Sequence, residues 1–513
     1  MSSSLITGGR LVGRAGPGGE PEVIRDGALY QEDGIILAVG PRAELASRYQ
    51  PDEVIGGDGM VVLPGFINAH HHLGLTPFQM GIPDLPLEMW IGARLAMRAV
   101  DPYLDTLYSA FEMIASGITT VQHLHGHMFL PPDRWTDTFE AVLRAYRDVG
   151  MRVSFSSGIV EQDRLVLAEE DFLATLSAEL RDRVRALPGS DRVPVVDQLQ
   201  AAYGDLVHRW GGGSEPRVSI QLAPQNLHWC SDAALRAIKE ASDRDGAAMH
   251  MHLVESPYQK EYARRRTGGT AVAHLAELGL LGPSMTLGHA VWLTEDDIEQ
   301  VAASGTFICH NASSNLRLRS GIAPLNQFLE RGVKVAIGID EAGINEDRDM
   351  LQELRMVLNL HRVPGVESPA PDPRAVFQMA TEHGALTTGF GATIGVLEPG
   401  RSADLSLLDW DSVAAPHLAP EVGVVDAILH RARSAAVRTV LVAGEPIYRD
   451  GRFTRVDQEA ALAELSASLR GPRSELEMDR GRLADELVPR IKSFLSGWSW
   501  EGSDPFYRVN AKS

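Results

Sequence analysis

Four short apolar runs, far apart in the sequence, each end in residues that can bind a metal ion. They are PGFINAHHH (64–72), AAMHMHLVE (247–255), MTLGHA (285–290) and VKVAIGIDE (333–341). Strand and helix patterns alternate between them, and the candidate strands are 61–69, 118–123, 151–157, 217–223, 246–252, 285–289, 306–309 and 333–339. Eight such alternations predict an α/β fold of the TIM-like (β/α)8 barrel type. A doubly wound sheet is the alternative, but it would not place functional residues at so many strand ends.

Both ends of the chain are rich in short strands and tight turns. Neither segment, 1–60 or 393–455, is large enough for a core of its own, so we expect one small β-sandwich built from both. The barrel then covers 61–392, with a polar insertion over 160–215 that would lie above the barrel mouth. Residues 456–513 form a C-terminal extension, helical over 456–497 and followed by an aromatic tail.

Composition excludes several classes of partner. The formal net charge of −20 argues against nucleic acid and against anionic membranes. No apolar run reaches the roughly 20 residues needed to span a bilayer, and the N-terminus lacks the features of a secretory signal. Only two cysteines are present, Cys230 and Cys309, which fits a reducing compartment. We therefore expect a cytoplasmic protein.

The first and fifth strands supply histidines suited to one metal site. His70 and His72 are two residues apart on a strand, so their side chains point to the same side. His252 ends the fifth strand, and Asp340 ends the eighth in an otherwise apolar run, where a carboxylate is costly unless it is paired or metal-bound. The fourth-strand segment VSIQLAPQN (218–226) contains no lysine that could bridge a second metal. The sequence therefore favours a mononuclear site.

Other polar residues at these strand ends have different expected places. His71 faces away from His70 and His72, and His250 lies deeper in the barrel as an interior, hydrogen-bonded histidine. Glu255 follows His252 by three residues and suits proton transfer. His289 ends the sixth strand and gains weight from its place in the series.

The motifs together resemble those of the amidohydrolase superfamily. The runs that carry the resemblance are PGFINAHHHLG, HMHLVES, LGHAVWL, HNASSNLRLRSGIAP, GIDEAG, LEPGRSADL and VAGEPIYRDGR, in family order. They cover roughly residues 5–455 and are most similar to the branch of cytosine, guanine and adenosine-type deaminases and triazine hydrolases. The resemblance also implies a homo-oligomer, a dimer or larger.

The resemblance implies a role for each strand-end residue. The metal ligands would be His70, His72, His252 and Asp340, holding one Zn²⁺ or alternatively Fe²⁺. Asp340 would also accept a proton from the metal-bound water, and Glu255 would carry protons to the substrate ring and the leaving group. His289 would hydrogen-bond the attacking hydroxide or polarise the reacting centre.

The substrate pocket is harder to predict, because the sequence departs from the family there. Glu341 follows Asp340 where related deaminases commonly have glycine, and the second strand ends in the histidine-rich run 122–127. Loops that contact the distal part of the substrate in related enzymes include DLPLEMW (84–90). The candidate pocket residues are Glu88, Trp90, His125, Gln225, Asn226, Trp229 and Glu341.

Three functions remain open at this point. The first is a hydrolase in which metal-bound hydroxide displaces ammonia or an amine from an N-heterocyclic carbon of a purine, pyrimidine or triazine-like small molecule. The second attacks the C–N bond of a urea, amide or carbamate, or removes another leaving group from a triazine-like ring. The third is a non-catalytic scaffold, which the full set of metal ligands argues against.

Overall fold

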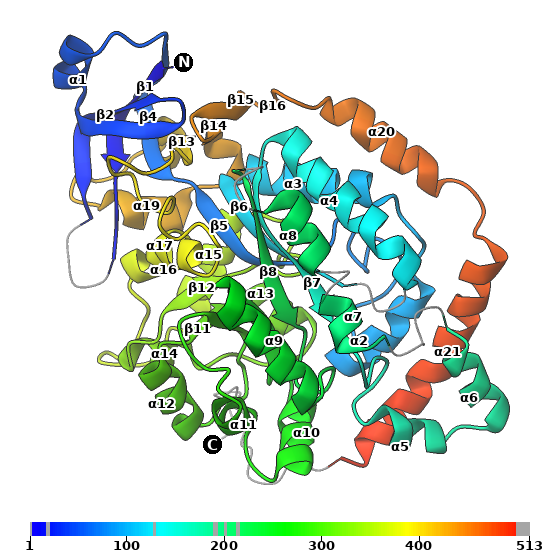
Figure 1. Cartoon of the computed structure of the whole chain (residues 1–513). Helices are drawn as coiled ribbons and strands as arrows, with labels where there is room; N and C mark the ends of the chain where they lie inside the picture. Colours follow the sequence, from blue (N-terminus) through cyan, green and yellow to red (C-terminus); the bar gives the residue numbers. More distant parts are fainter. Residues whose placement is uncertain are drawn as a thin grey trace.

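A closed barrel of eight parallel strands forms the centre of the molecule (Figure 1). The computed structural model describes residues 3–16, 21–126, 130–187, 193–199, 203–211 and 216–498. The barrel strands, in spatial order, are β5 (Phe66–His71), β6 (Ile118–His125), β7 (Arg152–Ile159), β8 (Val218–Pro224), β9 (Met249–Leu253), β10 (Met285–His289), β11 (Phe307–His310) and β12 (Val335–Ile337). The backbone N–H of Asp340 donates to His70 O over 2.8 Å and closes the ring. The predicted barrel is confirmed.

Helices surround the barrel and connect its strands. They are α3 (Pro102–Ala115), α4 (Trp135–Val149), α9 (Asp232–Asp245), α10 (Pro257–Thr267), α11 (Ala271–Glu277), α12 (Glu295–Ser304), α13 (Ala312–Arg317), α14 (Leu325–Glu330), α15 (Met350–Leu360), α16 (Pro373–Met379) and α17 (Glu382–Leu386). Their first residues follow ordinary capping chemistry: the Ser231 side chain accepts from Ala234 N at the start of α9, and Thr294 and Asp297 form a capping box on α12.

The two chain ends meet in a second, mixed sheet. Its order is β16 (Arg452–Phe453), β15 (Glu445–Arg449), β14 (Val437–Val442), β13 (Leu405–Asp409), β4 (Glu53–Pro64), β1 (Ser3–Val12), β2 (Val23–Glu32) and β3 (Ile35–Pro41). Strand β4 pairs in parallel with β1 and antiparallel with β13, so the joint between the two ends lies there. Helices α1 (Arg42–Arg48), α18 (Trp410–Ala414) and α19 (Val424–Arg431) complete this part. The predicted β-rich module from both ends is thus present, as one continuous hydrogen-bonded sheet.

The first predicted barrel strand, 61–69, is in fact two strands. Its residues 61–64 end β4 in the mixed sheet, where Pro64 lies opposite Leu405, and only from Phe66 does the chain belong to the barrel. The break falls at Gly65, where a Cβ would lie 2.2 Å from Thr119 Cγ2 of the neighbouring strand. Both halves are apolar and buried, which is why the pattern read as one strand. The domain boundaries themselves stay a prediction.

Part of the insertion and the last helix of the chain lie together beside the barrel (Figure 1). The insertion contains α5 (Glu169–Ala174), α6 (Ala178–Arg185), α7 (Val195–Leu199) and α8 (Asp205–Trp210), and the extension contains α20 (Gln458–Leu469) and α21 (Glu475–Ser496). The predicted helical character of 456–497 is confirmed. Helix α21 packs on α2 (Leu87–Ala93) and shares an apolar cluster with the insertion. His127 and tail residues 499–513 lie outside the described residues.

Within the described residues, no helix has both the length and the apolar character to cross a bilayer.

Candidate metal centre and substrate pocket

Four side chains converge at the carboxyl ends of the barrel strands. The Nε2 atoms of His70, His72 and His252 lie 3.1 Å from one another. Asp340 Oδ1 lies 3.2 Å from His72 Nε2 and 3.6 Å from His70 Nε2. Ligand atoms around a tetrahedral metal with bonds of about 2.0–2.1 Å are about 3.3–3.4 Å apart. The spacing of these four donors therefore fits one small divalent cation.

Backbone carbonyls orient two of the imidazoles toward the common point. His252 Nδ1 donates to Gln225 O over 2.8 Å, and His72 Nδ1 donates to Leu124 O over 2.6 Å. A carbonyl oxygen can only accept, so Nδ1 of each ring carries a proton, and Nε2 is the atom that faces the site. Such hydrogen bonds are the usual support of metal-binding histidines.

The other two strand histidines lie where the sequence predicts them. His250 is buried beneath the site, with Nε2 2.9 Å from His70 Nδ1. Burial, with the neighbouring imidazoles, lowers the pKa of His250 to about 3, so it is a neutral acceptor for the His70 Nδ1 proton. His71 points the other way, with Nε2 3.2 Å from Ser109 Oγ. His250 and His71 therefore support the metal centre without facing it.

Asp340 is a buried carboxylate held in its ionised form. Its Oδ2 accepts a hydrogen bond from Ser314 Oγ over 2.6 Å. Burial opposes its charge, but the hydrogen bond and charge of His72 lower the pKa of Asp340 below its usual range. Its backbone is left-handed, with φ of 64°, and His289 shares this conformation with φ of 68°. Such strain is held by surrounding structure and is common at functional sites.

Glu255 and His289 lie side by side next to the four ligand candidates. Glu255 Oε1 is 3.6 Å from His289 Nδ1 and accepts from Ser320 Oγ over 3.3 Å. Burial raises the pKa of Glu255 well above its usual value, with a smaller contribution from the charge of Asp340. His289 Nε2 lies 3.8 Å from Asp340 Oδ2, and Asn315 Oδ1 lies 2.8 Å from His289 Nδ1. The pair thus connects a carboxyl of raised pKa to the metal end of the site.

A cavity of about 370 Å³ opens onto this centre. That volume is within the range of small-molecule sites. Six of the seven predicted pocket residues line it, together with His72, His252, Glu255, His289 and Asp340: they are Trp90, His125, Gln225, Asn226, Trp229 and Glu341. Val160, the first residue of the insertion, also lines it, so the insertion begins at the cavity as predicted.

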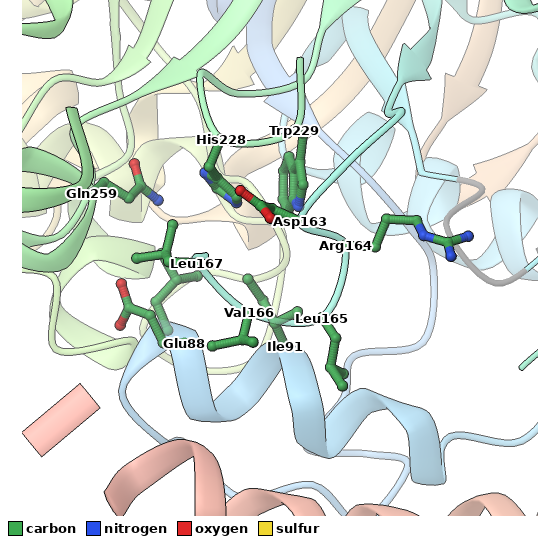
Figure 2. Close-up of a pocket in the computed structure, with 11 residues that line it drawn as sticks. Glu88, Ile91, Asp163, Arg164, Leu165, Val166, Leu167, His228, Trp229 and Gln259 are labelled. Carbon is green, nitrogen blue, oxygen red and sulfur yellow. The ribbon is translucent and has the colours of Figure 1, made fainter. Parts of the chain in front are cut away.

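Glu88, the seventh predicted residue, lines a smaller pocket beside this cavity (Figure 2). Ser256 Oγ donates a hydrogen bond to Glu88 Oε1. Burial raises the pKa of Glu88 to about 7. The two pockets share part of their walls, which are formed by Leu87, Ile91, Trp229 and Gln259.

The cavity also contains arginines that the sequence did not single out. Arg94 lies 4.8 Å above the Trp90 ring and 3.4 Å from Glu341 Oε1. Arg98 and Arg480 line the same cavity. Nothing in the local pattern marks these positions: Arg94 and Arg98 lie in and just after a short 3₁₀ turn, and Arg480 reaches the site from α21, nearly 400 residues later. The supporting groups around His289 did have a signal in the run HNASSNLRLRS (310–320), from which Asn311, Ser314, Asn315 and Ser320 come.

Curated relatives match nearly the whole chain. A 5-methylthioadenosine/S-adenosylhomocysteine deaminase of Pelotomaculum thermopropionicum is 30% identical over 469 residues, covering 90% of this chain and 97% of the relative. A 5'-deoxyadenosine deaminase of Methanosarcina mazei is 29% identical over 475 residues, covering 92% and 95%.

Solved structures and a family description agree with this match. An adenosine deaminase of Xanthomonas campestris with bound zinc has a TM-score of 0.76 at 25% identity, covering 94% of this chain and 99% of that one. Atrazine chlorohydrolase of Arthrobacter aurescens has a TM-score of 0.72 at 21% identity, covering 90% and 99%, and shows the shared fold. The model of the amidohydrolase family matches residues 61–447. The chain therefore belongs to the amidohydrolase family.

Proposed function

We propose that this protein is a hydrolytic deaminase of adenine nucleosides. In this reaction water replaces the exocyclic amino group on the purine ring, so that N=C–NH₂ and H₂O give HN–C=O and NH₃. The observation that carries the proposal is the buried Glu255 carboxyl beside His289, both lining the cavity of the four-ligand centre. An amine leaves only after it gains a proton, and a carboxyl with a raised pKa is suited to supply one.

The residues of this chain divide the proton transfers between them. When bound, a divalent cation lowers the pKa of water toward about 7 and so supplies the nucleophile at neutral pH. Asp340, ionised next to His289, takes the proton that the attacking water releases. Glu255 donates its proton to the ring nitrogen beside the attacked carbon, takes up the second proton of the attacking water as C=O forms, and passes it to the leaving amine. The proton held by Asp340 then restores Glu255 for the next turnover. His289 holds the attacking oxygen through its Nε2.

The substrate class follows from the relatives and from the pocket. Both curated relatives are named for adenosine derivatives with altered 5' groups, and they cover nine-tenths of this chain. The cavity offers the indoles of Trp90 and Trp229 as apolar walls, and the buried Glu341 Oε2, which has no hydrogen-bond partner among the described residues, as an acceptor for a substrate N–H. Loss of chloride from a triazine would leave the Glu255 proton without this use, because chloride leaves without gaining a proton.

We assign zinc to the centre in preference to iron. A set of three imidazoles and one carboxylate suits both metals, but the adenosine deaminase of similar fold contains bound zinc. Two further proposals concern the location of the protein and its oligomeric state. A cytoplasmic location is supported by two buried, unpaired cysteines, Cys230 and Cys309, and a homo-oligomer is supported by the family resemblance alone.

Ammonia release from a panel of compounds tests the reaction. The panel contains adenosine, 5'-deoxyadenosine, 5'-methylthioadenosine, cytosine, guanine, an aminotriazine, a urea and an amide, each offered to zinc-loaded protein. We expect ammonia from at least one adenine nucleoside and formation of the matching hypoxanthine nucleoside. Release only from cytosine, guanine or the triazine would move the substrate class, and release only from the urea or amide would contradict the proposal.

Glu255→Gln tests the proton transfer separately from metal binding. The amide keeps the shape of the side chain but cannot exchange a proton, so we expect a loss in kcat of about 10²–10⁴-fold with unchanged zinc content. Metal analysis and turnover are measured on the same samples. Glu277→Gln, at an exposed carboxylate of α11, serves as the control and should retain full activity. A fully active Glu255→Gln variant would show that another group moves the proton.

A further inference from the structure

Helix α21 is fixed over the substrate cavity, although it lies beyond residue 447, where the family match ends. It crosses α2 at Gly92, where a Cβ would approach Ile491 Cδ1 to 2.6 Å. The guanidinium of Arg98 donates to Leu469 O over 2.6 Å and to Gly471 O over 3.1 Å, in the segment that leads into α21. The C-terminal helix is therefore held to the wall of the site at more than one point.

The inner face of α21 is part of a closed apolar core. It packs against η1 (Arg94–Ala96) and the insertion, and its buried residues are Leu483, Ala484, Leu487, Ile491 and Leu495. The helix in Figure 1 runs beside α5 and α6 on one side and α2 on the other. A helix buried in this way presents fixed side chains to the cavity rather than a mobile tail.

Arg480 is the residue of α21 that reaches the cavity. It lines the same space as His72, His252 and Asp340. Its Nε is buried and has no hydrogen-bond partner among the described residues. The neighbouring Arg482 behaves differently, because it is exposed and pairs with Asp479 on the helix surface over 3.2 Å.

The charge of Glu477 acts on Arg480, but the two side chains form no ion pair. Glu477, one turn earlier on the helix, accepts from Ser474 N over 2.8 Å and from Ala99 N over 3.1 Å, so both of its oxygens are already engaged. Glu341, another glutamate that lines the cavity, is paired with Arg94. In the part of the chain that the structure describes, Arg480 forms no ion pair, in a protein of net charge −20.

We propose that Arg480 binds an anionic group of the substrate, a carboxylate or a phosphate, at the end remote from the reacting carbon. This inference rests on the proposed deaminase function and names a feature of its substrate. A guanidinium suits either anion because its planar fork can donate two parallel hydrogen bonds. The anion would lie away from the metal end because Arg480 comes from α21, which packs on α2 and η1, whereas the ligand candidates lie at the ends of the barrel strands. The C-terminal extension is thus a specificity element of the site.

Substrates that share a ring but differ in charge test this role. The probes are 5'-methylthioadenosine as the neutral compound, S-adenosylhomocysteine for the carboxylate and adenosine 5'-monophosphate for the phosphate. We expect Arg480→Ala to lower kcat/KM for one of the two anionic substrates by about 10–100-fold, with a change below about 3-fold for the neutral one. Arg480→Lys should retain an intermediate value, because a point charge remains without the fork. Arg482→Ala is the matched control on the same helix and should match the wild type.

Binding measurements separate failure of this inference from failure of the proposed function. Calorimetric titration of the same three compounds into the wild type and Arg480→Ala reports affinity whether or not ammonia is released. Absence of deamination with selective loss of anion affinity in Arg480→Ala would overturn the reaction and support the anion site. Deamination with equal losses for charged and neutral compounds, or with no loss for either anion, would overturn the anion site alone. Thermal midpoints of all variants confirm that the fold is retained.

Discussion

The two ends of the substrate cavity are built in different ways. At the metal end, each candidate ligand sits at the end of a barrel strand, and backbone carbonyls and strained strand ends fix its orientation. At the other end, the cavity is covered by α2, the insertion and α21, three segments joined by side-chain packing and by polar side-chain contacts such as the Arg183–Glu486 pair. The chemistry is therefore set by the barrel backbone, whereas recognition of the rest of the substrate is set by packed helices that can change without disturbing the ligands.

The metal end should fail completely when one ligand is removed. His252→Ala deletes one of the three Nε2 donors, and we expect metal affinity to fall by more than about 100-fold, since loss of a supporting partner alone costs 10–100-fold. Activity should fall with the metal, while the thermal midpoint of the metal-free wild type and of the variant stay close. Zinc content by atomic emission and ammonia release are the measurements. His417→Ala, at an exposed histidine, is the control. A variant that keeps one zinc per chain would remove His252 from the ligand set.

The same division explains what the sequence could predict. Ligands at strand ends follow from a two-residue spacing and from polar residues in apolar runs, so the positions of His70, His72, His252 and Asp340 could be worked out before any fold was known. Their roles as ligands stay a prediction. The strand predicted over 61–69 shows the limit of this reading, because a continuous apolar run does not reveal that its two halves join different sheets.

The segments that cover the outer end of the cavity, α2, the insertion and α21, were predictable only in part. Trp90 and Glu88 were both expected at the substrate from one loop, yet only Trp90 lines the large cavity, because residues two apart on a helix such as α2 point in different directions. Arg94 and Arg480 could not be found from sequence, since each gains its place through tertiary contacts between segments hundreds of residues apart. Helix periodicity predicts that α21 has a buried face but not what that face meets.

Weaker packing of the covering helices should lower stability and substrate binding without loss of the metal. Leu487 is fully buried between α21 and the insertion, and we expect Leu487→Ala to lower the free energy of unfolding by about 2–5 kcal/mol. Metal content should not change, and KM should rise more than kcat falls, because the ligands belong to the other end of the cavity. Urea unfolding, zinc analysis and steady-state kinetics measure these effects.

A matched surface leucine controls for the loss of side-chain volume. Leu476 lies on the same helix but is 57% exposed, so Leu476→Ala should change stability by less than about 0.5 kcal/mol. If Leu487→Ala also lost its zinc, the two ends of the cavity would be coupled, and the separation between chemistry and recognition would be wrong.

The smallest effect is expected at Glu88, in the smaller pocket beside the cavity. Burial raises the pKa of Glu88 to about 7 in the folded protein from the ordinary glutamate value of 4.5, so the native state binds its proton more tightly than the unfolded state does. Stability is therefore lost as the pH rises through the interval between these values and is fully lost above about 7. Glu88→Gln keeps an acceptor for Ser256 but cannot ionise. Its free energy of unfolding relative to the wild type should thus increase between pH 5 and pH 8, by about 2–3 kcal/mol for a shift of this size. Urea unfolding at the two pH values measures it, and an equal difference at both would mean that Glu88 ionises freely in its pocket.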